Sequence, residues 1–446
     1  MPFVHWLAAL QGEEHMNKTL LSGDSVSAIS PTLAVNERVR SLWGQGKNVF
    51  HLAFGESRMP LHPKLVSALK ENVEQKSYLD STGLFELRQA IARFHERHFQ
   101  APILPENVVV GPGSKALLFG ILLGIECDVY LPTPSWVSYA PQAELARRQY
   151  RYLKGSFDDG YEITVDSIGE SIKEFGTGRL PVLILNSPNN PSGKTLSESK
   201  LKELGDFCRE KQILVVSDEI YAMTTFDRQR HRSILEFYPE GTIVVGGPSK
   251  HLSLGGWRLG TALIPDSNIG LMVASVLQTV ASEIWSSPTS AIQYAAIAAY
   301  ADDEDVDGYI QACTDLHELK TRFISRSFKQ MGIRCTDPRG GFYFIANFDD
   351  QRDLLKSHQI ETSTQLAHFL LVNHEIATLP GTAFGIPEHE LSLRIATSYI
   401  DMETDGKAQR LMSSFLAKGR MLDRDDLPNT LLAIEQMRNF INSGNT

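Results

Sequence analysis

The stretch Pro181 to Tyr221, "PVLILNSPNNPSGKTLSESKLKELGDFCREKQILVVSDEIY", reads as strand, turn, helix and strand in that order. Its runs at 181–186 and 213–218 are apolar at nearly every position, which is typical of strands buried on both sheet faces. Between them, apolar side chains fall on one face of a predicted helix: Leu201, Leu204, Phe207 and Cys208. Strands separated by a helix pair in parallel through a right-handed crossover. The stretch therefore predicts an α/β fold.

The same alternation continues on both sides of this stretch. Further apolar runs at 107–111, 129–132 and 242–247 predict strands, and a helical pattern at 114–125 follows the first of them. We expect a three-layer α/β/α domain with a mostly parallel sheet over residues 65–305.

A change of pattern after residue 305 indicates a second, smaller domain. A long helical stretch at 306–331 precedes the runs "GGFYFIANF" and "LSLRIATS", which predicts a smaller α+β domain over 306–446. Residues 1–64 comprise an N-terminal extension and a strand, "NVFHLAF", which is expected to pack with the smaller domain because it needs a sheet to join. The last residues, "INSGNT", are expected to form a frayed tail.

Composition narrows the class of protein. The 446 residues carry a formal net charge of -10, which argues against nucleic acid or an anionic membrane as the main partner. The first twenty residues lack a basic leader and a clear cleavage site, so no signal peptide is expected. The four cysteines are too far apart for metal pairs or a disulfide framework. They predict buried apolar fillers in a reducing compartment, and hence a cytoplasmic protein.

Two loops after predicted strands could hold a ligand. Gly113, Ser114 and Lys115 open a helix, where free backbone N–H groups can bind an anion, although a plain helix cap would look the same. The turn 187–193 contains two prolines and a glycine, so it is stiff enough to hold Asn189 or Asn190 at a fixed angle. That turn could equally be only a turn.

Three charged residues at the ends of apolar runs point more sharply to a ligand. Asp218 ends a buried strand, where a carboxylate needs a partner, either in a structural ion pair or in a cationic ligand nitrogen. Lys250 follows "TIVVGGPS"; a lone lysine there is ordinarily a surface residue, but one near other cations becomes a nucleophile toward carbonyls. Arg258 can grip a phosphate. A ligand with an aldehyde, a ring nitrogen and a phosphate is pyridoxal 5′-phosphate (PLP).

Motifs in a fixed order carry a resemblance over about 33–441. They are "FGES", "SYLDSTGLFELRQAIA", "GPGSKAL", "PTPSWVSY", "NSPNNPSG", "SDEIY", "SKHLSLGGWRLG", "GGFYF" and "LSLRIATSY". The chain resembles fold-type I PLP-dependent enzymes of the class I/II aminotransferase family, which include aspartate aminotransferases. The resemblance implies the PLP cofactor.

The resemblance also implies roles at the cofactor. Lys250 holds PLP as an imine, and Asp218 keeps the pyridine nitrogen protonated. Tyr221 and Asn190 bond the phenolic oxygen, and Trp136 stacks on the ring. The phosphate cradle comprises Gly113, Ser114, Lys115, Ser249 and Arg258.

For the substrate and the partner subunit, the resemblance implies further residues. Arg394 forks onto the substrate α-carboxylate, assisted by Gly55, Trp136 and Asn190. Its apolar neighbours in the sequence make the alternative, an arginine on a solvated strand face, less favoured. Tyr78 reaches the phosphate in the neighbouring subunit, which implies a homodimer with shared sites.

The sequence departs from the family pattern at two places. Gly247 stands where the family often has a hydroxyl residue, a loss for which Ser249 could compensate, and "GESRMP" replaces the commoner "GEPDF" at the mouth of the site. We find no second arginine placed for a distal carboxylate, so a dicarboxylate substrate is not supported.

The expected reaction is transfer of an amino group between an α-amino acid and a 2-oxo acid, without a metal. One alternative is another reaction from the same carbanion: β- or γ-elimination or replacement, cyclisation, or oxidation. A PLP-binding regulator is a remote alternative, because the first fifty residues are too short and not basic enough for a DNA-binding module. A catalytically dead homologue is disfavoured because Lys250, Asp218 and Arg394 are all present.

Overall fold

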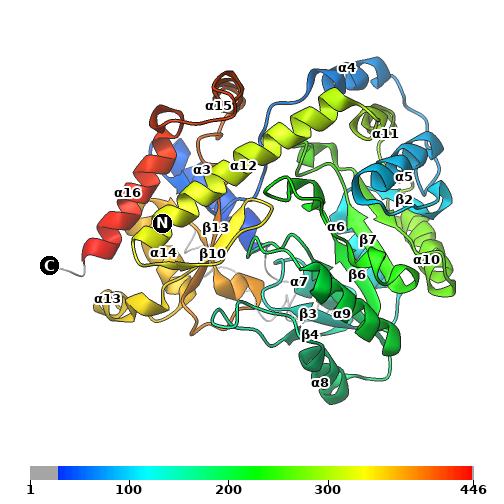
Figure 1. Ribbon diagram of the computed structural model, residues 1–446, viewed down its shortest axis with the longest axis horizontal. Coiled ribbons are helices and arrows are strands. Elements are labelled where there is room, and N and C mark those ends of the chain that lie inside the picture. The colour runs from blue at the N-terminus through cyan, green and yellow to red at the C-terminus, as the bar shows by residue number, and fades with distance from the viewer. Residues whose placement is uncertain (1–28, 444–446) are drawn as a thin grey trace, which may run out of the picture.

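The computed structural model describes residues 29–443, which build a seven-stranded sheet between two layers of helices and a smaller four-stranded sheet beside it (Figure 1). The extension expected before residue 29 and the last three residues lie outside this range. The domain boundaries 1–64, 65–305 and 306–446 stay a prediction.

The large sheet has the strand order β2-β8-β7-β6-β5-β3-β4. Its strands are β2 (Val108–Gly111), β3 (Cys127–Pro132), β4 (Gln149–Leu153), β5 (Leu180–Asn186), β6 (Leu214–Asp218), β7 (Thr242–Gly246) and β8 (Gly260–Leu263). Strands β3 to β7 pair in parallel, whereas β8 runs antiparallel to both β2 and β7. The mostly parallel sheet is confirmed.

Alternate residues of each strand enter different cores, which explains the uninterrupted apolar runs. Val109 lies in a core with α6 (Ser114–Gly124), α7 (Tyr139–Leu145) and α10 (Asn268–Ile284), whereas Val108 and Val110 face α5 (Phe85–Phe99) on the other side. That second face is also covered by α8 (Val165–Phe175) and α9 (Glu198–Glu210), and α4 (Pro63–Asn72) packs on α11 (Ser290–Ala296). Because both faces of the sheet are buried, its strands carry apolar residues at successive positions instead of alternating apolar and polar ones.

The smaller sheet is antiparallel, in the order β12-β13-β10-β9. Its strands are β9 (Arg334–Cys335), β10 (Tyr343–Asn347), β12 (Leu379–Pro380) and β13 (Ser392–Ala396), with α13 (Arg352–Ser357), α14 (Ser363–His374), α15 (Asp405–Ala417) and α16 (Pro428–Asn442) around it. Strand β1 (Phe50–His51) pairs in parallel with β11 (Ile376–Ala377). The expectation that the early strand joins the C-terminal part of the chain is therefore confirmed.

One long helix connects the regions around the two sheets. The long helix α12 (Glu304–Gln330) runs from beside α11 toward β10 (Figure 1), and Asp303 caps its N-terminus by accepting from the N–H groups of Asp305 and Val306. Helix α3 (Pro31–Gly44) precedes β1 and contacts β12. No helix among residues 29–443 is long and apolar enough to cross a membrane.

The cysteines correct one expectation. Cys127, Cys208 and Cys313 are buried and free, as predicted, but Cys335 is only half-buried because it lies on the edge strand β9. Loss of hydration raises the pKa of all four thiols to about 12.

Candidate active site

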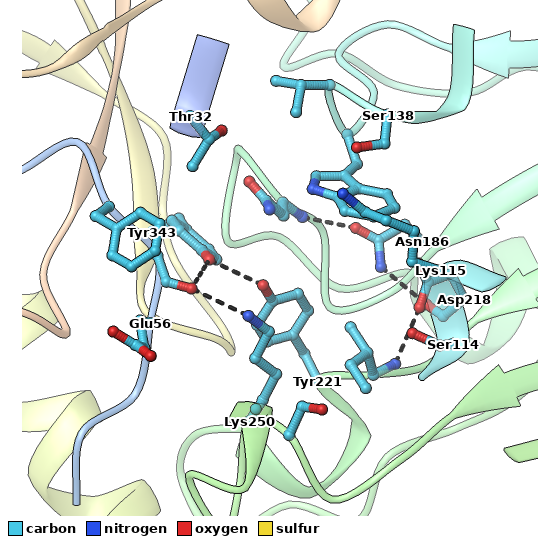
Figure 2. A pocket seen from close by; sticks show the side chains of 18 of the residues that line it. Thr32, Glu56, Ser114, Lys115, Ser138, Asn186, Asp218, Tyr221, Lys250 and Tyr343 are labelled. Atoms are coloured by element: carbon cyan, nitrogen blue, oxygen red, sulfur yellow. Dashed lines mark hydrogen bonds between the residues drawn. The ribbon is translucent and has the colours of Figure 1, made fainter. Parts of the chain in front are cut away.

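A cavity of about 480 Å³ lies at the carboxyl ends of the parallel strands, where open α/β sheets bind ligands (Figure 2). Almost all of the predicted site residues line it: Gly55, Ser114, Lys115, Trp136, Asn190, Asp218, Tyr221, Ser249, Lys250, Arg258 and Arg394. Residues before position 60 and after position 340 complete the wall of the cavity, so the site is formed by segments that are far apart in the sequence.

Asp218 is the last residue of β6 and lies at the floor of the cavity, only 3% exposed. Burial raises the pKa of its carboxyl to about 6. The Tyr139 hydroxyl donates to Oδ2 at 2.7 Å and the Ile220 N–H donates to Oδ1 at 3.2 Å, and both bonds oppose that rise. The carboxylate is thus mostly ionised near neutral pH. It faces the cavity, and no arginine or lysine among residues 29–443 forms an ion pair with it.

Lys250 enters the cavity from the loop after β7. Its Nζ donates to the carbonyl of Gly55 at 3.0 Å. Burial lowers the pKa of the ammonium to about 8; Arg394 and Lys115 lower it further, while Glu56 and Asp218 oppose them. About a tenth of the amine is therefore unprotonated at pH 7, far more than for an ordinary lysine, and this is the form that attacks carbonyls.

Two tyrosines lie against this amine. The hydroxyls of Tyr221 and Tyr343 are 2.9 Å apart, and Tyr343 donates to the same Gly55 carbonyl at 3.2 Å (Figure 2). Burial raises the pKa of both phenols, so both are neutral. Gly55 has no room for a side chain, because a Cβ there would lie 1.8 Å from the Tyr343 hydroxyl.

Arg394 projects from β13 and is 1% exposed. Its Nη1 donates to Oδ1 of Asn190 at 3.1 Å and its Nη2 donates to the carbonyl of Ala53, while its Nε has no hydrogen-bond partner among residues 29–443. Burial lowers the pKa of this guanidinium, and it has no carboxylate partner within the described chain. A buried cation that lacks an anion in a cavity wall suits an anionic ligand group.

The stiff turn after β5 holds Asn190 rather than Asn189 toward the cavity. Asn189 Oδ1 accepts from the N–H and hydroxyl of Ser192, which closes the turn itself. The Asn190 N–H donates to Oδ1 of Asn186 at 2.7 Å, and Asn186 in turn donates to the Asp218 carbonyl at 2.8 Å. Asn186 thereby links the turn to β6.

The other end of the cavity is the N-terminus of α6. Gly113 caps this helix with φ of 94°, and a Cβ there would lie 2.3 Å from Nη2 of Arg258. Lys115 Nζ lies 4.9 Å from the centre of the Trp136 ring, and burial followed by the charge of Arg258 lowers its pKa. The positively charged side chains of Lys115 and Arg258 therefore lie close to the free N–H groups at the N-terminus of α6.

The glycine that replaces the expected hydroxyl residue has a backbone reason. Gly247 has φ of 148°, and a Cβ at this position would lie 2.8 Å from the carbonyl of Leu259, the residue before β8. A serine or threonine does not fit this path, whereas Ser249 lines the cavity.

Two predicted site residues do not line the cavity: Gly113, which lies beside it as the N-cap of α6, and Tyr78. Tyr78 is 87% exposed and does not line the pocket. Its assignment to a neighbouring subunit stays a prediction.

Tyr139, Tyr343 and Asn186 were not predicted from the sequence as site residues, although each lies in or beside a quoted motif: "PSWVSY", "GGFYF" and "PVLILN". The two tyrosines read as core residues, and only the fold brings their hydroxyls to Asp218 and Tyr221. Asn186 ends an apolar strand, and only the fold shows its bonds to Asp218 and Asn190.

Comparison with known proteins agrees with this arrangement. The model of the family "Aminotransferase class I and II" matches residues 47–410. An aspartate aminotransferase of Bacillus subtilis (strain 168) is 32% identical over 384 residues, covering 84% of this chain and 94% of that relative. One of Geobacillus stearothermophilus is 33% identical over 390 residues, covering 85% and 95%.

Solved structures share the fold. An aspartate aminotransferase from Thermus thermophilus with maleate superposes with a TM-score of 0.78 at 23% identity, covering 94% of this chain and 99% of that chain. With a family match over most of its length and relatives above 30% identity, the chain belongs to the aminotransferase class I and II family.

Proposed function

We propose that this protein moves an amino group between an α-amino acid and a 2-oxo acid, using PLP held at Lys250. The observation that carries the proposal is the placement of two buried groups in one cavity: the Lys250 amine, whose pKa is lowered to about 8, and the Asp218 carboxylate. Relatives named aspartate aminotransferase and asparagine–oxo-acid transaminase support the reaction class.

The residues of the cavity fit PLP. The group of Lys115, Arg258 and the α6 N-terminus suits a phosphate, and Gly113 leaves the backbone free of a Cβ there. Asp218 suits a protonated ring nitrogen, and Trp136 offers an aromatic face. When bound, PLP supplies an aldehyde that condenses with amines and a ring that accepts the electron pair of a deprotonated carbon.

The chain itself supplies binding, orientation and proton transfer. Arg394 binds the substrate α-carboxylate, and Asn190 holds the guanidinium in place. Lys250 Nζ removes the proton from substrate Cα, a step for which an amine with a pKa of about 8 is well matched. Asp218 would hold a proton on the ring nitrogen of bound PLP, because a carboxylate favours a positive charge beside it.

An absorbance experiment tests the proposal. Adding an amino acid without an acceptor to the PLP-loaded protein should remove its visible absorption band in one turnover and release the matching 2-oxo acid. Adding a second 2-oxo acid should restore the band. Release of ammonia, pyruvate or peroxide without restoration would instead indicate one of the alternative carbanion reactions.

We also propose that the protein is a cytoplasmic homodimer. Four free thiols support a reducing compartment, and the exposed Tyr78 supports a partner. The arginines of this chain that line the described pocket are Arg258, which is assigned to the phosphate, and Arg394, so neither is left for a second carboxylate of the substrate.

A further inference from the structure

The segment 55–59 lines the cavity through its first three residues and carries the Gly55 carbonyl that accepts from both Lys250 and Tyr343. Its path therefore sets where the lysine amine is held. At residues 57 and 58 this chain has "SR" in place of the commoner "PD". Ser57 therefore offers a hydroxyl and Arg58 a guanidinium, and proline and aspartate have neither group.

A buried chain of hydroxyl and imidazole groups ties this segment to the loop that follows Lys250. Ser57 Oγ lies 2.6 Å from Oγ of Ser253 and 3.0 Å from Nε2 of His317. Ser253 Oγ also accepts from the Met59 N–H at 3.0 Å. Ser57 is 4% and His317 1% exposed. Three elements thus meet at one serine hydroxyl: the segment 55–59, the loop 250–254, and helix α12.

Each group in this chain can donate or accept as its neighbours require. Ser253 Oγ accepts from the Met59 N–H, and the bonds of Ser57 to Ser253 Oγ and to His317 Nε2 can each run in either direction. Burial lowers the pKa of His317 to about 3, so the ring is neutral and carries its proton on one nitrogen. In either direction, Ser57 is bonded to both neighbours.

The imidazole also lies behind the rings that face the amine. His317 packs against Phe342 with ring centres 4.9 Å apart, and Lys250 Nζ lies 5.9 Å from the centre of the same Phe342 ring. His317 therefore supports the site through a hydrogen bond on one side and through a ring contact on the other.

The same segment has a second anchor, which does not reach the lysine loop. Arg58 donates to the hydroxyl of Tyr399 at 3.2 Å and to the Glu403 carbonyl at 3.0 Å, and pairs with Asp405 at 2.5 Å. Arg58 ties the segment to the region of α15, whereas Ser57 ties it to the lysine loop.

We infer that Ser57, Ser253 and His317 form a positioning cluster that holds the Lys250 loop against the Gly55 segment and so fixes the amine for proton transfer. The proton-transfer role of the Lys250 amine rests on the proposed function, whereas the effect of the cluster on that amine can be tested in the protein without PLP. Ser57 and His317 act through Lys250, and both lie outside the set of residues predicted from the sequence.

The first test uses the protein without PLP. The pH dependence of Lys250 acetylation, followed by peptide mass spectrometry, reports the pKa of the amine. In Ser57→Ala and in His317→Leu, a loosened loop admits water, so the pKa should rise from about 8 toward the ordinary lysine value of 10.5. His317→Gln, which keeps a polar group near Nε2, should restore much of the wild-type value.

The second test uses the PLP-loaded protein. Ser57→Ala should lower kcat by about 10- to 100-fold, the usual effect of a misplaced reacting group, with KM changed by less than about threefold. The pH midpoint of the visible band should move in the same variants.

Thr321→Val is the matched control. Its hydroxyl lies on α12 one turn after His317 and bonds Thr397 at 2.6 Å, and Thr397 keeps its own bond to the Phe342 carbonyl. If Ser57→Ala and His317→Leu both behave as Thr321→Val does in acetylation and in kcat, the cluster is merely structural and the inference is overturned. Failure of the wild-type protein to bind PLP or transaminate would overturn the proposed function, and the acetylation result would still decide the inference.

Discussion

At the scale of the residue, the candidate site depends on the carboxylate of Asp218 and the amine of Lys250. Burial raises the pKa of the carboxyl group and lowers the pKa of the ammonium group. Asp218 has a pKa raised to about 6, and Lys250 has one lowered to about 8. Between these values the carboxylate is charged and much of the amine is protonated, with the neutral fraction growing as the pH rises. Activity should therefore increase from about pH 6 to pH 8.

Tyr139→Phe tests the hydrogen bond that opposes the burial of Asp218. This bond lowers the pKa of the carboxyl, so its loss should raise that pKa and move the acidic limb of the pH–rate profile to higher pH. The profile of kcat/KM, measured from pH 5 to 9, is the readout. Tyr150→Phe serves as control, because its hydroxyl bonds Glu144 away from the cavity. An acidic limb that stays in place would contradict this account of Asp218.

Arg394→Lys tests the carboxylate site. A lysine cannot reproduce the planar fork, and charge-assisted hydrogen bonds are worth about 1.5–3 kcal/mol, so kcat/KM for amino acids should fall about 10- to 100-fold. The slow reaction of an amine that lacks the α-carboxylate should not change. Equal losses for both substrates would mean that Arg394 acts only in folding.

At the scale of the element, strand ends and one helix N-terminus do most of the positioning. Asp218 ends β6, Asn186 ends β5, and the two are register partners, so the turn after one strand lies beside the carboxylate of the next. The sequence predicted this edge because both strands are apolar throughout and are followed at once by polar residues.

Other elements were beyond prediction from the sequence for physical reasons. Strand β4 alternates exposed and half-buried residues at the sheet edge and gives no apolar run. Strand β8 is four residues long and begins at Gly260, whose Cβ would lie 2.1 Å from the Ser114 backbone nitrogen, so its sequence reads as part of a glycine-rich loop. Contacts between distant elements, such as Tyr343 on β10 with Tyr221, leave no local pattern.

Gly113→Ala tests the helix N-terminus. The new Cβ would push Arg258 away and would also strain a backbone with φ of 94°, so PLP affinity should fall by at least about tenfold. PLP titration followed by absorbance measures this loss. Gly178→Ala is the control, since φ there is 84° and a Cβ meets nothing within 4 Å; it should cost stability alone. Equal affinities in the two variants would contradict the proposed cradle.

At the scale of the whole molecule, the cavity is assembled from distant parts of one chain and, as we propose, from a second subunit. Gly55, Lys250 and Arg394 come from three widely separated stretches, and the sequence predicted each of them through its own motif. What it could not predict is the arrangement between them, including the junction of Ser57, Ser253 and His317, because that depends on how α12 packs.

Mixing two inactive variants tests the shared site. A hybrid dimer combines one Lys250→Ala subunit with one Tyr78→Ala subunit, so one of its two shared sites has both native residues. Unfolding the two variants, mixing them and refolding them together should therefore restore roughly a quarter of wild-type activity. Neither variant alone should recover. Absence of recovery in a mixture whose hybrids are confirmed by native mass spectrometry would mean that Tyr78 serves no neighbouring site.

The pairing of β1 with β11 has a consequence for how the protein is made. Phe50 and His51 leave the ribosome about 300 residues before their partners Ile376 and Ala377. At about 5–20 residues per second, this nascent strand waits on the order of 15 s to a minute for its neighbour. The large sheet can form during that wait, whereas the Gly55 segment settles only after translation has nearly finished, so PLP capture is a late event in biosynthesis.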